Sequence, residues 1–195
     1  MLYHVPYDTT TANIVGVDPG TNTLGYAVVS FDVRTLALTG VRAHTYTADR
    51  MHPSTHIEMM YGARISRLAL LNSELLYAYS CDTPVMVMCE SPFINTKRPA
   101  AYGALVEAVD CIRGALMQYD HAIPFRLVPP SNVKNSIGAK GADGKDAIKL
   151  AMLRHPEISQ LASVDQYDEH SIDALAVAYS GLSLVRQCGL HTLFL

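Results

Sequence analysis

Two acidic residues stand directly after short apolar segments that have the length of a buried strand. Asp18 follows residues 13–17, and Glu90 follows residues 85–89. A third group lies far along the chain and combines the acidic residues Asp168, Glu169 and Asp173 with His170. A few carboxylates, together with waters and a substrate phosphate, are the ligands that Mg²⁺ prefers. These three parts of the chain can hold a divalent metal if the fold brings them together.

Each group also has an ordinary explanation when it is taken alone. Asp18 precedes Pro19 and Gly20, and an aspartate in such a turn often caps it with its own carboxylate. Acidic residues in the first turn of a helix stabilise the helix dipole, which accounts for the group at 168–173. The hypothesis of a metal site therefore depends on all three groups together.

The residues between the acidic groups predict the elements that must position them. Short apolar or alternating runs predict strands, and apolar residues at three- and four-residue steps predict helices. Met60 and Ile65 fall on the apolar stripe of the first helix. The expected order is three antiparallel strands at 13–17, 24–32 and 37–45, a helix at 56–80, a strand at 85–89, a helix at 99–119 and a strand at 125–128.

The last third of the chain is predicted to be mainly helical. Ser131 can cap a short helix that runs through Ile137, and Asp143 can cap another at 145–153. Residues 157–167 form an irregular or helical connection, and the final helix covers 168–185. In that helix His170 and Asp173 are three residues apart, so they share one face.

Length and composition favour one well-packed domain. The chain has 195 residues, of which 49% are hydrophobic and 17% charged. We assign residues 13–187 to the domain, 1–12 to an N-terminal arm and 188–195 to a tail. The net charge of −3 argues against a protein coated with basic charge, but leaves room for a local basic patch that faces nucleic acid.

The cysteines and the N-terminus predict a soluble intracellular protein. The four cysteines form no CxxC pair, and no segment has the pattern of a signal peptide or the length of a membrane span. We expect the protein in the cytoplasm, or in the host cytoplasm if its source is viral.

Three local sequences resemble those of the RuvC-type Holliday-junction resolvases. They are VGVDPGTNTLGYAVV near the start, VMCESPFIN around Glu90 and HSIDALAVA near the end, and the resemblance spans roughly residues 14–179. The first and last motifs are specific in combination and weak singly. The resemblance implies the RNase H-like fold of the α/β class, with a mixed five-stranded sheet of three antiparallel and then parallel strands, flanked by helices.

The same resemblance implies the residues of the site. Asp18, Glu90 and Asp173 correspond to metal-binding carboxylates. His170 stands where many relatives have another aspartate and some have histidine, so the resemblance makes it a further catalytic residue whose neutral imidazole can ligate the metal or accept a proton. Lys134 and Lys145 match two lysines near the active site, where a positive charge can stabilise the phosphate in the transition state. For the DNA, the resemblance gives Phe93 as an aromatic that probes the junction centre, and Asn95, Lys97, Arg98 and Lys140 are weaker candidates for backbone contacts.

We therefore expect a metal-dependent endonuclease that resolves four-way DNA junctions in recombination and repair. Phosphodiester hydrolysis needs cations to neutralise the developing charge, and two Mg²⁺ ions about 4 Å apart do this in related sites, where Mn²⁺ can substitute. Symmetrical incision of paired strands needs two equivalent sites, so the resemblance implies a homodimer. No small-molecule cofactor and no membrane are expected.

Three other readings remain open. Asp18 to Thr21 also looks like the first phosphate loop of the actin and sugar-kinase group, but those proteins need a second similar domain. A metal-free module that binds junctions would tolerate loss of the acidic residues. A nuclease of the same fold could instead cut other branched or hybrid nucleic acids.

Overall fold

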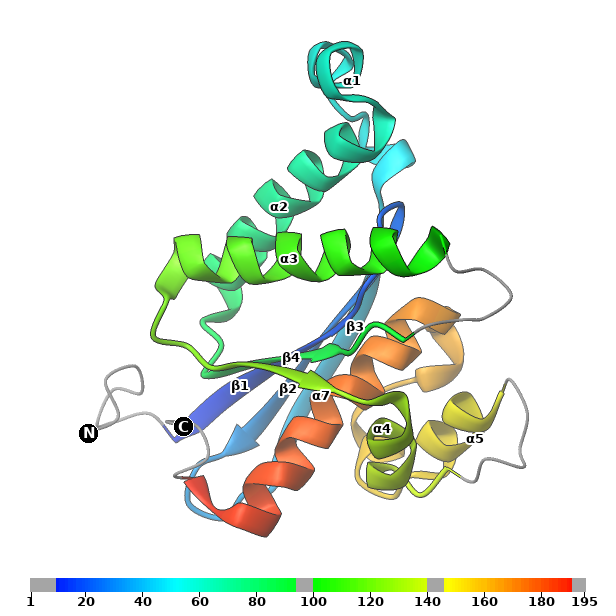
Figure 1. Ribbon diagram of the computed structural model, residues 1–195. Coiled ribbons are helices and arrows are strands. Elements are labelled where there is room, and N and C mark those ends of the chain that lie inside the picture. Colours follow the sequence, from blue (N-terminus) through cyan, green and yellow to red (C-terminus); the bar gives the residue numbers. More distant parts are fainter. Residues whose placement is uncertain (1–9, 94–99, 140–145, 191–195) are drawn as a thin grey trace.

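A mixed five-stranded sheet forms the centre of the computed structural model, which describes residues 10–93, 100–139 and 146–190 (Figure 1). The strand order is β3-β2-β1-β4-β5. The strands are β1 (Thr11–Asp18), β2 (Thr23–Asp32), β3 (Leu38–Thr47), β4 (Met86–Glu90) and β5 (Phe125–Val128). The first three pair antiparallel, and β4 and β5 continue the sheet in parallel. The predicted meander and mixed sheet are thus confirmed.

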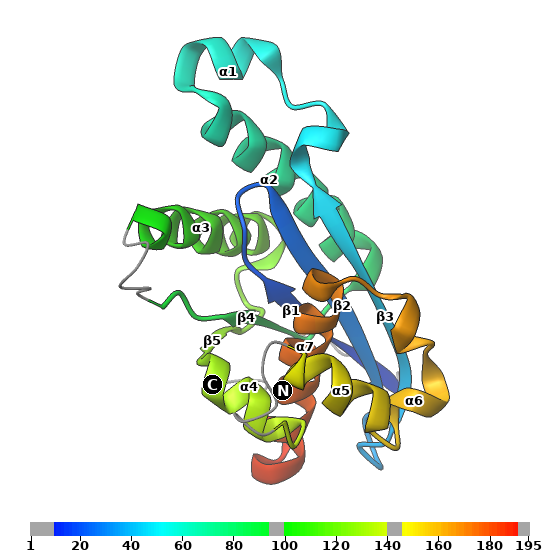
Figure 2. The ribbon, with the colours of Figure 1, turned by 90° about the vertical axis from the view of Figure 1, so that its right-hand side faces the viewer.

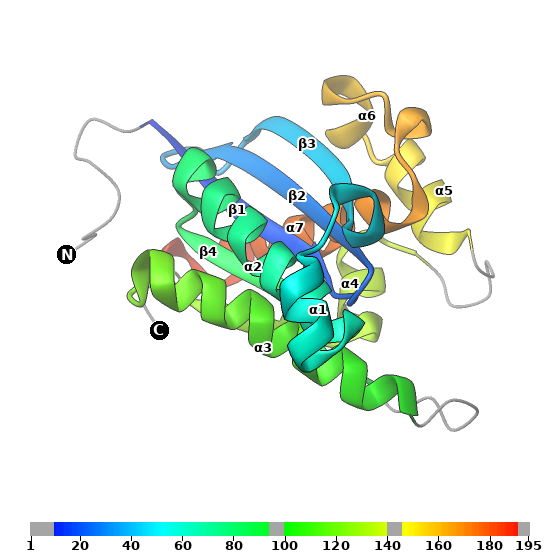
Figure 3. The ribbon, with the colours of Figure 1, turned by 90° about the horizontal axis from the view of Figure 1, so that it is seen from above.

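Helices cover both faces of the sheet, as Figure 3 shows. On one face lie α2 (Ala63–Asp82) and α3 (Ala100–Asp120). On the other lies α7 (Glu169–Cys188), which packs along β1 and β2. Beside α7 are α4 (Pro130–Ser136) and α5 (Ala147–Arg154), and the short α6 (Ile158–Leu161) lies against β3 (Figure 2).

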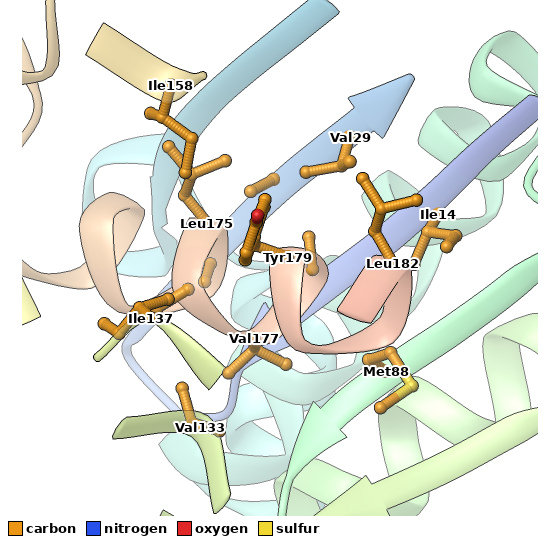
Figure 4. Packing of buried hydrophobic residues seen from close by; sticks show 14 of the residues in the cluster. Ile14, Val29, Met88, Val133, Ile137, Ile158, Leu175, Val177, Tyr179 and Leu182 are labelled. Carbon is orange, nitrogen blue, oxygen red and sulfur yellow. The ribbon is translucent and has the colours of Figure 1, made fainter. Parts of the chain in front are cut away.

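Alternation along the strands assigns each side chain to one of these two layers. In β1, Val15 and Val17 pack in the core beneath α2 and α3, whereas Ile14 packs in the core beneath α7. Figure 4 shows Ile14 near Leu182 of α7 on this second side. Because successive strand residues point to opposite faces, Asp18 shares the α7 face with Ile14.

A glycine in β1 allows α7 to approach the sheet closely. A Cβ at Gly16 would overlap with the backbone of Ala174 and Ala178. Glycine inside a strand often marks such a close approach of another backbone. The consequence is that α7 lies directly against the strand that ends in Asp18.

The long helix expected over residues 56–80 is in fact two helices, so this prediction was wrong. Helix α1 (Thr55–Tyr61) ends at Gly62, whose φ of 88° breaks the helix, and α2 begins at the next residue. Met60 and Ile65, placed on the buried stripe, are 62% and 41% exposed. The apolar period of the sequence continues across Gly62, but α1 projects beyond the sheet (Figure 1), contacts α2 and buries none of its own residues.

The capping predictions also need correction. Helix α4 begins at Pro130, with Pro129 as the N-cap, so Ser131 lies inside the helix. Proline in the first turn needs no N–H partner, which explains the earlier start. Helix α5 begins at Ala147 with Asp146 at its N-cap position, and Asp143 lies outside the described residues.

The ends of the expected domain can be compared with the described chain only in part. Strand β1 begins at Thr11, and the buried Ala12 belongs to the sheet and not to an arm. Helix α7 extends to Cys188, three residues beyond its expected end. Within the described ranges, no helix combines the length and hydropathy needed to cross a membrane.

Candidate active site

Two neighbouring strands deliver the first two carboxylates to one edge of the sheet. Strands β1 and β4 run parallel, with Val17 opposite Cys89, so Asp18 and Glu90 follow at the same end. Both are the last residues of their strands and are partly buried. Met86 and Met88 pack in the core beneath α7, so alternation also directs Glu90 to the face that α7 covers. The predicted strand-end acids therefore lie side by side.

Helix α7 brings His170 and Asp173 to the same edge. The Asp168 side chain accepts a hydrogen bond from the backbone N–H of Ser171 at 2.9 Å, which makes Asp168 the N-cap of the helix. His170 and Asp173 follow in the first turns, on one face. The prediction that His170 and Asp173 share one face of the last helix is confirmed. The predicted start of that helix at Asp168 was one residue too early, because Asp168 is its N-cap.

His170 is held by Asp18 across the gap between helix and sheet. Its Nδ1 donates a hydrogen bond to Oδ2 of Asp18 at 2.8 Å. This bond, opposed by partial burial, raises the pKa of His170 above its ordinary value of 6.5. Because Nδ1 is occupied, Nε2 is the ring nitrogen that remains able to bind a metal or to accept a proton.

Burial and neighbouring negative charges make both Glu90 and Asp173 difficult to ionise. Burial raises the pKa of Glu90 from 4.5 to about 7, and the charges of Asp18 and Asp173 add to the effect. Burial likewise raises the pKa of Asp173 from 3.8 to about 7, with Asp18 and Glu169 adding to it. Carboxylates that are difficult to ionise together are a known property of functional sites, because a bound cation relieves their repulsion.

Lys134 is the cation that α4 contributes to this edge. Its positive charge opposes the rise in pKa of both Glu90 and Asp173, which places it near the two carboxylates. The side chain is partly buried and so is not an ordinary solvated lysine. Lys134 was predicted from the family resemblance alone, and in the structure it lies near Glu90 and Asp173.

The donors at this edge fit an oxygen-preferring divalent cation. Asp18, Glu90 and Asp173 supply carboxylate oxygens. The pKa values of Glu90 and Asp173 stay raised although Lys134 lies near them, so a bound cation would stabilise their ionised forms further. Across the described ranges, no three His, Cys, Asp or Glu side chains stand close enough together to form a ready-made metal site. Asp18 is engaged by His170, so binding would require these side chains to adjust.

The predicted DNA contacts can be located only in part. Phe93 follows Glu90 and is 55% exposed, so it is not a loop residue packed into the core. Asn95, Lys97, Arg98, Lys140 and Lys145 lie outside the described residues.

Sequence reasoning missed the residues that set the distance between α7 and the sheet. A Cβ at Gly25 of β2 would overlap with the carbonyl oxygen of His170, so only glycine allows the helix to lie so close. A glycine in the middle of a predicted strand was the signal that could have identified this contact.

Comparison with known proteins gives relatives that match most of the chain in sequence. No protein-family model matches it. A crossover junction endodeoxyribonuclease RuvC of Rickettsia felis is 28% identical over 171 residues, covering 86% of this chain and 95% of the relative. The protein of the same name from Dehalococcoides mccartyi strain BAV1 is 29% identical over 167 residues, covering 85% and 87%.

Solved structures agree with the fold. The structure of Thermus thermophilus RuvC in complex with a Holliday junction substrate matches with a TM-score of 0.66 and 18% identity, covering 91% of this chain and 97% of that one. The yeast mitochondrial Holliday junction resolvase Ydc2 matches with a TM-score of 0.60 and 11% identity, covering 93% and 82%. The chain thus has the RNase H-like fold with acidic residues at one sheet edge. Its sequence relatives make the likeness more particular, because it resembles the RuvC-type resolvases over most of its length.

Proposed function

We propose that this chain is a metal-dependent endonuclease that resolves four-way DNA junctions by paired, symmetrical phosphodiester hydrolysis. The observation that carries the proposal is the convergence of Asp18, Glu90 and Asp173 at one edge of the sheet, where burial and neighbouring negative charges raise the pKa of the last two to about 7. A non-catalytic module has no need to keep such a costly arrangement. The RuvC relatives supply the substrate class.

In this proposal the three carboxylates hold the metal. Two Mg²⁺ ions, or Mn²⁺ in their place, would neutralise the charge that develops on the phosphate and would activate water when bound. Asp18 also orients the imidazole of His170 through Nδ1, which leaves Nε2 available as a ligand or as a proton acceptor. Lys134 adds positive charge beside Glu90 and Asp173, where it can stabilise the transition state more than the ground state.

DNA binding in this proposal uses residues around the same edge. The exposed ring of Phe93 is suited to stack against an unpaired base at the centre of the junction. In this proposal the DNA is positioned by phosphate contacts from Asn95, Lys97, Arg98, Lys140 and Lys145. Lys145 would also lie near the scissile phosphate. Replacing Phe93 by Ala should reduce the fluorescence change of a 2-aminopurine placed at the junction centre, while Phe93→Tyr should retain it.

We also propose that the active form is a homodimer, since two symmetrical cuts require two equivalent sites. The proposed nuclease domain runs from the start of β1 at Thr11 to the end of α7 at Cys188, and it acts in the cytoplasm of its source cell or host. Free cysteines Cys81, Cys89, Cys111 and Cys188 support a reducing compartment.

A panel of substrates tests the proposal. A synthetic four-way junction, a linear duplex, a flap and an RNA–DNA hybrid of matched sequence are incubated with Mg²⁺, Mn²⁺ or EDTA. We expect cleavage of the junction with either metal and little cleavage of the duplex. Preferred cleavage of the flap or hybrid would assign a different nuclease function, and junction binding without any cleavage would identify a binding module.

A further inference from the structure

Three residues form a row across the sheet beneath the first turn of α7. Asp18 of β1 pairs with Gly25 of β2, and Gly25 pairs with Thr45 of β3. Residues paired in this way lie side by side on the same face of a sheet. The row therefore runs perpendicular to the strands, from the carboxylate of the site to the strand at the edge.

Each member of the row meets a different part of the same helical turn. Asp18 accepts the hydrogen bond of His170 at 2.8 Å. Gly25 leaves room for the backbone carbonyl of His170. Thr45 donates a hydrogen bond through Oγ1 to Oδ1 of Asp168, the N-cap, at 2.5 Å.

The contact at Thr45 joins the N-cap to the sheet. Oδ1 of Asp168 also accepts bonds from the backbone N–H and the hydroxyl of Ser171, at 2.9 Å and 2.6 Å. This one oxygen therefore caps the first turn of α7 and also links that turn to β3. Without the contact to β3, Asp168 would still cap the helix but would no longer fix its rotation relative to the sheet.

We infer that Thr45 and Asp168 are positioning residues that orient the first turn of α7 so that His170 and Asp173 face Asp18. This inference rests on the proposed nuclease function. Helix ends fray because their first N–H groups lack partners, and both site residues of α7 lie in the end of the helix. An error of about 1 Å in the position of a reacting group can cost about a hundredfold in rate, so attachment at several points along the row has a large effect.

If Asp168 only capped the helix, the hydroxyl of Thr45 would have no effect on the cleavage rate. Variants of Thr45 therefore test whether the link to β3 positions the site. Thr45→Val keeps the shape and strand propensity of threonine but removes the hydroxyl, and Thr45→Ser restores the hydroxyl. Thr47→Val is the matched control, because Thr47 lies two residues further along the same face of β3 and its side chain makes no capping hydrogen bond. Thr45→Val is preferred to Asp168→Ala, since loss of the cap could unfold the helix end.

Two measurements decide the inference. Single-turnover cleavage at saturating protein, together with the dissociation constant for the junction, should show Thr45→Val to be slower by about ten- to a hundredfold at unchanged affinity. Thr45→Ser and Thr47→Val should cut within about twofold of the wild-type rate. The ¹⁵N NMR resonance of Nδ1 of His170 should move in Thr45→Val and stay in place in the other two variants, whether or not the protein cuts junctions.

The outcomes separate this inference from the proposed function. If the wild-type protein cuts no junction but the Nδ1 resonance of His170 moves as expected, the positioning role stands and the proposed function fails. If the protein cuts junctions and Thr45→Val matches it in rate and in the Nδ1 resonance, the positioning role is overturned. Equal loss in Thr45→Ser would also overturn it, because the hydroxyl would then not be the cause.

Discussion

Replacing Glu90 by Gln should stabilise the metal-free protein at high pH while it removes a carboxylate of the site. Burial and the charges of Asp18 and Asp173 raise the pKa of Glu90 in the folded protein from 4.5 to about 7. The folded state therefore holds this proton more tightly than the unfolded state does. Its contribution to stability is present below pH 4.5 and is lost as the pH rises through 7.

The size of the effect follows from the two pKa values. The difference between 4.5 and about 7 corresponds to about 3 kcal/mol of stability lost at high pH, since one pH unit is about 1.36 kcal/mol. Asp173 shares the same repulsion, and a partly buried amide with unmet hydrogen bonds costs about 1 kcal/mol. We therefore expect Glu90→Gln to gain about 1 to 2 kcal/mol at pH 8.5, or roughly 2 to 8 °C in melting temperature for a chain of this size.

Urea denaturation in EDTA at pH 5 and pH 8.5 measures this difference. Glu58→Gln is the control, because Glu58 lies on α1, in the exposed end of the molecule. Glu90→Gln should be more stable than the wild type at pH 8.5 and should lose that advantage at pH 5. Addition of Mg²⁺ should stabilise the wild type more than the variant. A variant that is equally destabilised at both pH values would refute the electrostatic account of this edge.

Three further outcomes follow from the contacts of the site and of the helix end. Lys134→Ala should lower the single-turnover cleavage rate by more than it lowers junction affinity, with Arg34→Ala as control, because Arg34 is exposed beyond the end of β2 that lies away from Asp18; equal losses in rate and affinity would assign Lys134 to binding alone. His170→Ala should lose most of the cleavage activity, whereas His170→Asp should retain it. The imidazole must be neutral to work and Asp18 raises its pKa above 6.5, so the cleavage rate of the wild type should fall more steeply toward low pH than that of His170→Asp, over about pH 5.5 to 8.5. An unchanged rate and pH profile in His170→Ala would leave this histidine a structural role only. Arg186→Met should destabilise the fold at neutral pH by about 1 kcal/mol after allowance for solvent exposure, because Arg186 forms two hydrogen bonds with Glu157 and lowers the pKa of Glu157 to about 2. Arg186 also donates hydrogen bonds to the Leu36 carbonyl and the Tyr179 hydroxyl, so the loss should shrink, but not vanish, as the pH falls through that value; urea denaturation that shows the same loss at neutral pH and at pH 2 would contradict the ion pair.

The strands and their acidic ends could be predicted because short-range pattern decides them. The apolar runs before Asp18 and Glu90 are buried on both faces, so each reads as continuous apolar sequence, and a polar residue directly after such a run must lie at the sheet edge. That β1 and β4 are neighbours in the sheet could be predicted only from the family resemblance, because local periodicity carries no information on strand order.

The failures have a common physical origin in contacts between distant segments. Met60 of α1 and Ile65 of α2 fit a helical stripe, but whether a stripe is buried depends on what lies opposite. Among the described residues α1 contacts α2 and buries none of its own residues. The role of Asp168 as a link to β3 was also beyond the sequence, because Thr45 stands 123 residues away. The raised pKa values of Glu90 and Asp173 likewise arise only when the chain has folded.

Cleavage of a strand-labelled four-way junction by Asp18→Asn tests the central claim most directly. The substitution keeps the shape of the side chain but removes the negative charge that Asp18 contributes to the site and, with it, the charged partner of His170. The wild type and the control Asp165→Asn should make paired incisions at symmetrical positions in the presence of Mg²⁺. Asp18→Asn should bind the junction with similar affinity and make no incision, whereas full activity in Asp18→Asn would contradict a metal-dependent site at this sheet edge.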